Sequence, residues 1–70
     1  MSRVMYRQEF FATEADARQF IKKQGYGALY KNTPRSHSRK QFLVEVAVSG
    51  LTQAELGDKN YCVAWNQRIQ

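Results

Sequence analysis

Alternation at a spacing of two, which Gln8 interrupts in the first stretch, predicts a strand in each of four stretches of the chain. In the first stretch, Val4, Tyr6 and Phe10 share one face at a spacing of two. The clearest alternation is in the third stretch, where an aromatic residue and three valines occupy every second position from Phe42 to Val48. The four predicted strands are residues 3–11, 26–31, 41–48 and 61–66.

Helical spacing replaces alternation between residues 14 and 24. Thr13 precedes this stretch as an N-cap, and the acids Glu14 and Asp16 fall in the first turn, where the helix dipole favours negative charge. Apolar residues then follow at spacings of three and four. Two lysines and Gly25 close the stretch, as is typical of a helix C-terminus. The pattern therefore predicts a helix over residues 14–24.

The order of elements indicates the fold class. A short helix or turn at residues 51–56 completes the series strand, helix, strand, strand, short helix, strand. One main helix on one face of a mostly antiparallel sheet buries these stripes, so we expect a single small α+β domain over residues 1–70. A helix-turn-helix is the alternative, with a turn at residues 25–27 and a second helix from Ala28. Pro34 would end that second helix early, which favours the strand interpretation.

Size and cysteine content exclude several classes of protein. The chain has 70 residues with one Cys and one His, which rules out an internal disulfide and a zinc site. No uncharged stretch approaches the ~18 apolar residues of a membrane span. The charged N-terminal residues lack the apolar region of a signal peptide. We therefore expect a cytoplasmic protein with no metal, no cofactor, no membrane contact and no small-molecule substrate.

Lys and Arg are concentrated in one segment. The chain has 11 Lys and Arg against 6 Asp and Glu, a net charge of +5, and no acid occurs between Asp16 and Glu45. Such a segment is typical of a surface that neutralises nucleic-acid phosphates, and Tyr26 and Tyr30 beside it would stack on unpaired bases. His37 would contact phosphate from the predicted loop at residues 31–40. The predicted nucleic-acid contacts are Arg18, Lys22, Lys23, Tyr30, Lys31, Arg35, His37, Arg39 and Lys40.

Two other interpretations compete with a nucleic-acid surface. The cations are equally typical of a solvated face that keeps a small domain in solution, and they would also attract an acidic protein. The predicted strand faces place a separate set of apolar residues outside the core, and a contiguous patch there would bind a protein partner or form a homodimer. A misassigned face, or cover by residues 51–56, would remove this patch. The set consists of Met5, Phe11, Leu29 and Leu43.

The candidates for catalysis lack the partners that catalysis requires. His37 lies between two serines with no acid nearby in sequence to support general-base chemistry. Cys62 alternates with strand residues, as is typical of a small buried side chain. Gly25 and Gly27 follow a helix and lack the third glycine of a dinucleotide motif. We therefore expect a non-enzymatic module that contacts the backbone of DNA or RNA, or alternatively a protein-interaction module such as a small inhibitor or assembly adaptor.

Overall fold

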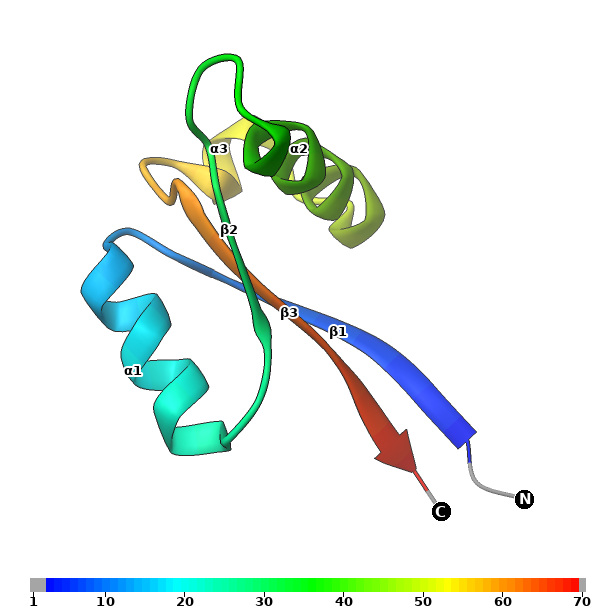
Figure 1. The fold of residues 1–70 in the computed structure, drawn as a ribbon. Coiled ribbons are helices and arrows are strands. Elements are labelled where there is room, and N and C mark those ends of the chain that lie inside the picture. Colours follow the sequence, from blue (N-terminus) through cyan, green and yellow to red (C-terminus); the bar gives the residue numbers. More distant parts are fainter. Residues whose placement is uncertain (1–2, 70) are drawn as a thin grey trace.

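The computed structural model describes residues 3–69, which form three strands and three helices. Their arrangement confirms the predicted α+β class, with an antiparallel sheet and helices packed on it. Figure 1 shows the path of the chain through these elements. They are β1 (Arg3–Phe11), α1 (Glu14–Gln24), β2 (Ala28–Lys31), α2 (His37–Ser49), α3 (Gln53–Leu56) and β3 (Tyr61–Ile69).

The last strand of the chain is the centre of the sheet. The strand order is β1-β3-β2, and β3 is antiparallel to both of its neighbours. β1 pairs with β3 over nine residues, from Arg3 opposite Ile69 to Phe11 opposite Tyr61. β2 pairs with β3 only between Ala28 and Lys31. β1 is therefore a long edge strand, and β2 is a short edge strand on the other side.

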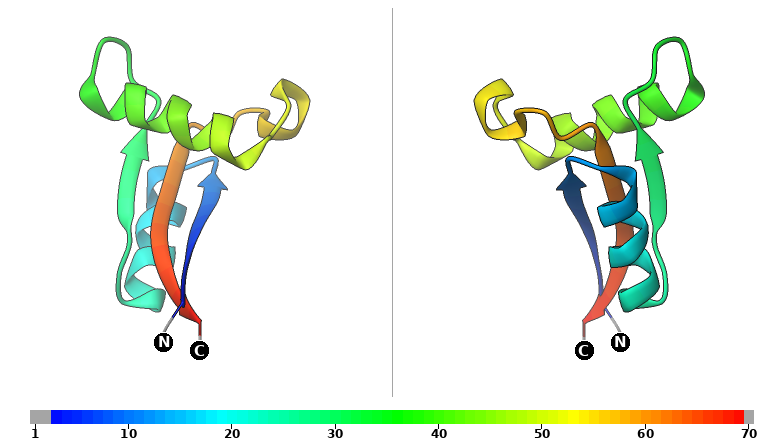
Figure 2. Two further views of the ribbon diagram at one scale, coloured as in Figure 1. Left: turned by 90° about the vertical axis from the view of Figure 1, so that its right-hand side faces the viewer. Right: turned by 90° about the vertical axis from the view of Figure 1, so that its left-hand side faces the viewer.

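Helix α1 lies along one face of the sheet, and α2 crosses the other face at the end where β1 terminates (Figure 2). On one face, the ring of Phe20 from α1 lies 5.3 Å from the ring centroids of both Phe11 and Trp65. On the other face, Phe42 from α2 meets Phe10 edge-on, with 5.8 Å between ring centroids. The adjacent residues Phe10 and Phe11 thus anchor one helix each, because successive side chains of a strand point to opposite faces. Leu56 and Cys62 complete the buried cluster around Phe42.

The predicted strand at residues 41–48 is wrong, because this stretch belongs to helix α2. Ser36 is the N-cap of α2, and its Oγ accepts a hydrogen bond from the backbone N–H of Arg39 at 3.0 Å. Gly50 ends the helix in the left-handed conformation, and its N–H donates to the carbonyl of Ala47. The apolar residues of α2 itself are spread over all sides of the helix, so its sequence shows no helical spacing that would distinguish it from a strand.

Other predicted elements agree more closely with the structure. The first strand and the helix at residues 14–24 are confirmed, and the short helix forms within residues 51–56. The second strand begins at Ala28 and not at Tyr26 as predicted, and the last strand extends beyond residue 66 to Ile69. Because residues 28–31 form a strand, the helix-turn-helix alternative is excluded. The prediction of one main helix on one face is corrected, because α2 packs on the second face. The predicted loop at residues 31–40 is divided among the end of β2, a short loop and the first turn of α2.

Candidate functional site

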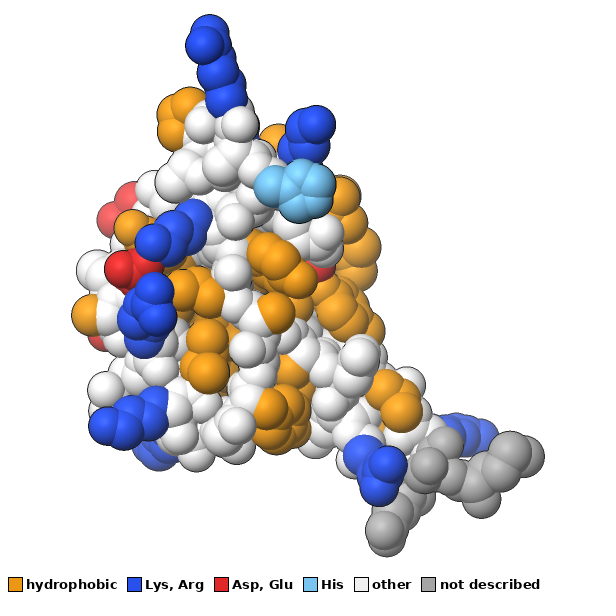
Figure 3. All heavy atoms as spheres, viewed as in Figure 1, with side chains coloured by type: hydrophobic (Ala, Val, Ile, Leu, Met, Phe, Trp, Pro, Cys, Tyr) orange, Lys and Arg blue, Asp and Glu red, His pale blue; other side chains and the backbone are white. Residues whose placement is uncertain are grey.

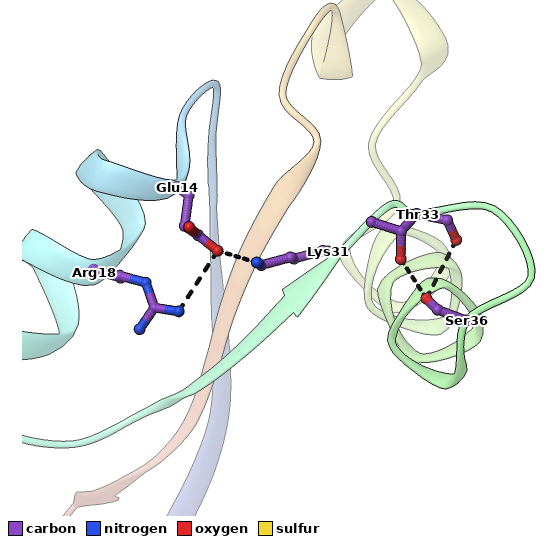
Figure 4. Close-up of polar contacts among 5 residues, drawn as sticks. All are labelled: Glu14, Arg18, Lys31, Thr33 and Ser36. Carbon is purple, nitrogen blue, oxygen red and sulfur yellow. Dashed lines mark hydrogen bonds and ion pairs between the residues drawn. The ribbon is translucent and has the colours of Figure 1, made fainter.

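Glu14 partly neutralises two of the predicted nucleic-acid contacts. Its Oε1 forms an ion pair with Lys31 Nζ and lies 3.6 Å from Arg18 Nη2, as Figure 4 shows. The hydrogen bond from Lys31 is the largest cause that holds the pKa of Glu14 below its usual value of 4.5. In sequence this acid lies outside the acid-free segment, whereas in space it lies between α1 and β2, among the cations of that segment.

The remaining exposed cations lie at the two ends of β2. Lys22 and Lys23 are in the last turn of α1, just before the turn that leads into β2. Arg35 and Lys40 belong to the loop after β2 and to the first turn of α2. Within residues 3–69, both ion pairs involve Glu14, and these four cations take part in neither.

Figure 3 shows the Lys and Arg side chains in separate groups, with apolar and uncharged side chains between them. One group lies over α1 and beside β2, and another lies around the loop and the start of α2, next to the histidine. We call these groups together the basic face. The name refers to these predicted nucleic-acid contacts, all of them exposed or partly exposed: Arg18, Lys22, Lys23, Lys31, Arg35, His37 and Lys40.

Arg39 has a structural role in the loop that follows β2. Its Nη1 donates a hydrogen bond to Asn32 Oδ1 at 3.1 Å, and the Asn32 amide donates to Asn60 Oδ1 at 3.1 Å. The hydroxyls of Thr33 and Ser36 are hydrogen-bonded to each other (Figure 4). These contacts tie the loop both to α2 and to the start of β3. Arg39 is only partly exposed, so it contributes less to the basic face than its exposed neighbours do.

The two tyrosines beside the basic face differ in exposure. Tyr30 is partly buried and packs against the core cluster around Phe42, so its ring is largely used inside the fold. Tyr26 is 50% exposed in the turn between α1 and β2, close in sequence to Lys22 and Lys23. Tyr26 is therefore the better placed of the two for stacking on a base.

Three of the four residues predicted as an outer apolar patch do share one face of the sheet, because the strand register puts Met5, Phe11 and Leu29 on the α1 side. Phe11 packs against Phe20 beneath α1. Leu29 is opposite the buried Val63 on that same face, and it is only partly exposed. Met5 is exposed near the far end of β1, whereas Leu43 is on α2 and not on a strand. The predicted patch therefore does not form one exposed surface, because α1 packs over Phe11 and Leu43 belongs to a helix and not to a neighbouring strand.

Helix α2 instead presents an apolar face to the surface. Leu43, Val44 and Val48 are 48%, 51% and 60% exposed, and the exposed Ala47 lies between them. The buried side of the same helix carries an acid, since Glu45 is only 2% exposed. A helix that buries a carboxyl group and exposes three large aliphatic side chains is unusual for a free surface. The sequence pattern did not reveal this face, because it assigned α2 as a strand.

Two further features bear on chemistry. Cys62 is fully buried, and desolvation is the largest cause that raises the pKa of its thiol to about 12. A thiol in this environment stays protonated and unreactive at neutral pH. Among residues 3–69, no three His, Cys, Asp or Glu side chains are placed to hold a metal ion. No helix in the same range combines the length and apolar character needed to cross a bilayer.

Known proteins supply no function for this chain by similarity. Comparisons with protein family models, with curated proteins and with solved structures give no match. The fold presents two distinctive surfaces, the basic face and the exposed apolar side of α2. The function is therefore inferred from the chemistry of these two surfaces.

Proposed function

We propose that the protein is a non-enzymatic module that binds the phosphate backbone of DNA or RNA through the basic face. The observation that carries the proposal is the group of exposed cations Lys22, Lys23, Arg35 and Lys40, which form no ion pair within residues 3–69. Cations without an acidic partner neutralise phosphates and release bound counterions, and this release drives association.

The placement of these cations suits an extended ligand better than a single phosphate group. They lie at both ends of β2, with the Glu14 cluster between them. A nucleic-acid strand passing along β2 would meet positive charge at each end. The exposed ring of Tyr26 lies at the end near Lys22 and Lys23, where it would stack on a base. This arrangement favours a strand with unpaired bases over a regular duplex.

Fluorescence anisotropy with labelled single-stranded RNA, single-stranded DNA and duplex DNA tests the proposal. We expect the affinity for single strands to fall with rising salt, with a logarithmic slope of about −0.7 for each phosphate contacted. The double variants K22A/K23A and R35A/K40A are each expected to weaken binding and to reduce this slope. Tyr26→Ala is expected to weaken binding to single strands and to leave the salt slope unchanged.

A matched control separates the basic face from net charge. Arg3→Ala combined with Arg68→Ala also removes two exposed cations, at the far end of the β1–β3 ribbon. We expect this variant to bind almost as the natural chain does. If it loses as much affinity as K22A/K23A, only net charge matters and the basic face is not the binding site. Absence of binding at low salt would reject the proposal outright.

A protein-interaction module is the second candidate, because α2 exposes an apolar face. Leu43, Val44 and Val48 lie together on the side of α2 that is turned away from the sheet. An acidic partner with an apolar groove would satisfy both this face and the neighbouring cations. Val44→Ser combined with Val48→Ser distinguishes the two candidates. Under the nucleic-acid proposal this variant keeps its affinity for single strands.

A further inference from the structure

The outer edge of β1 is open. β3 pairs with the inner edge of β1 along its entire length, and β1 is at the end of the sheet order. Figure 2 shows no other strand on its outer side. An edge strand presents unpaired backbone N–H and C=O groups, and proteins commonly shield such edges with charged side chains, proline, bulges or short strands. β1 carries the charges of Arg3, Arg7 and Glu9. β1 has nine residues and contains neither proline nor glycine.

A groove of about 590 Å³ follows this open edge. Residues 5–10 of β1 line it, together with Phe20 and Trp65 from the α1 side of the sheet. The rest of its lining consists of Ser49, Leu51, Glu55 and Lys59. The groove thus combines the outer edge of β1 with side chains of mixed polarity. This combination suits an added β-strand, which needs both an open edge and side chains to pack against.

We propose that the occupant is a second copy of this chain, whose β1 pairs with β1 in antiparallel orientation about a twofold axis at Gln8. The two sheets then join into one continuous sheet. Residues directly opposite each other in an antiparallel pair lie on the same face, so the axis of a symmetric pair must pass at a residue. The charges on β1 decide which residue this is.

Charge complementarity favours an axis at Gln8. An axis at Arg7 would place two arginines opposite each other, and an axis at Glu9 would place two glutamates opposite each other. Like charges in these positions are destabilising. An axis at Gln8 places Arg7 opposite the partner's Glu9, and the symmetry forms this pair twice. It also places Met5, which is exposed in the single chain, opposite the partner's Phe11.

One other register, with the axis at Tyr6, also places a positive residue opposite a negative one. It places Arg3 opposite the partner's Glu9, but it also places Arg7 opposite the partner's Met5. It leaves Phe10 outside the paired segment, although the groove extends from residue 5 to residue 10. The axis at Gln8 instead pairs the full length of the groove. The small size of the chain adds a reason for pairing, because domains of this length commonly gain stability by association.

Sedimentation velocity of charge-swapped variants, in the absence of nucleic acid, tests this proposal. We expect a species of twice the 8.2 kDa chain mass at high concentration. Arg7→Glu and Glu9→Arg each convert both cross-strand pairs to like charges, so each is expected to weaken the dimer about tenfold or more. The double variant R7E/E9R restores opposite charges and is expected to restore the dimer, which also shows that the substitutions are tolerated.

Arg3→Glu is the matched control, because it makes the same charge change on β1 outside the proposed pairs. We expect it to leave the dimer intact. A dimer that is lost in R3E would show the Tyr6 register and overturn the axis at Gln8. A monomer at every concentration, or a dimer indifferent to R7E and to E9R, would overturn pairing through β1. Because no nucleic acid is present, none of these results decides whether the basic face binds phosphate.

Discussion

Replacing Glu45 with Gln is expected to stabilise the protein at neutral pH. Glu45 is 2% exposed, and its Oε1 accepts a hydrogen bond from Gln41 Nε2 at 2.6 Å. Its buried Oε2 has no hydrogen-bond partner within residues 3–69, and neither ion pair in that range includes it. A buried charge without a partner destabilises the folded state. Gln has nearly the same shape, keeps an oxygen for Gln41 and carries no charge.

The size of the effect follows from this geometry. Leaving a buried polar group unpaired costs about 1–3 kcal/mol, and the cost is larger when the group is charged. The amide of the variant still has one unpaired group, so only the excess cost of the charge is recovered. We therefore expect the free energy of unfolding of E45Q to exceed that of the natural chain by about 1–2 kcal/mol at neutral pH. The neighbouring thiol of Cys62 offers no compensating positive charge.

The effect depends on pH, with a definite sign. Desolvation raises the pKa of Glu45 above its usual value of 4.5. As pH rises, the unfolded chain therefore loses this proton before the folded chain does. Between the unfolded and the folded pKa, the free energy of unfolding of the natural chain falls with rising pH, and above the folded pKa the penalty is constant. The advantage of E45Q is thus absent below pH 4.5 and complete above the folded pKa.

Urea denaturation followed by the fluorescence of Trp65, the single tryptophan of the chain, measures this difference. Trp65 packs against Phe20 in the core beneath α1, so its emission reports global unfolding. Glu55→Gln is the control, because Glu55 is exposed and Gln also serves in its capping box with Thr52. The assignment of Glu45 as an uncompensated buried charge is wrong if E45Q is less stable than the natural chain at neutral pH. It is also wrong if the difference in the free energy of unfolding between the two chains is the same at acidic and at neutral pH.

Three further predictions use other parts of the fold. Gly27→Ala is expected to lower the free energy of unfolding by about 2–3 kcal/mol, and Gly25→Ala by about 1 kcal/mol. Both glycines have positive φ, but only a Cβ at Gly27 would meet the buried side chain of Val63, at 2.9 Å. Equal losses for the two variants in urea denaturation would contradict this. Cys62, with its thiol pKa raised to about 12, is expected to react with a disulfide reagent only as fast as the chain unfolds, and rapid labelling of the native protein would show an accessible thiol. Glu14→Gln frees two cations and is expected to raise the affinity for single-stranded nucleic acid a few-fold at neutral pH in the anisotropy assay. This gain in affinity should vanish as pH falls through the lowered pKa of Glu14, because the carboxyl group of the natural chain then also loses its charge. If E14Q binds no more tightly than the natural chain at neutral pH, Arg18 and Lys31 do not belong to the binding site.

Local signals predicted α1 correctly because they act over a few residues. The side chain of Thr13 accepts a hydrogen bond from the N–H of Asp16, and Gly25 takes the left-handed conformation that ends the helix. Both features are visible in the sequence as a capping residue and a glycine at the right spacing. The alternation in β1 was equally informative, since Phe10 and Phe11 do point to opposite faces.

The error at α2 shows where local reasoning fails. Ser36 and Gly50 are ordinary start and stop signals for a helix, but the valines between them favour a strand by propensity. In the structure, Phe42 and Glu45 share the buried side at helical spacing, and Val44 and its apolar neighbours are exposed. Contacts with the sheet outweigh propensity here, because Phe42 gains a fully buried site against Phe10.

The sequence by itself determined the caps of α1, the alternation of side chains along β1 and the acid-free segment of cations, because each depends on the order of nearby residues. Only the tertiary structure decided that β3 lies between β1 and β2, which leaves β1 as an open edge. It also brought Glu14 to Lys31, and so reduced the positive charge that a linear count assigns to the basic face. These contacts join residues far apart in the chain, so they depend on strand pairing and helix packing, which short-range patterns do not encode.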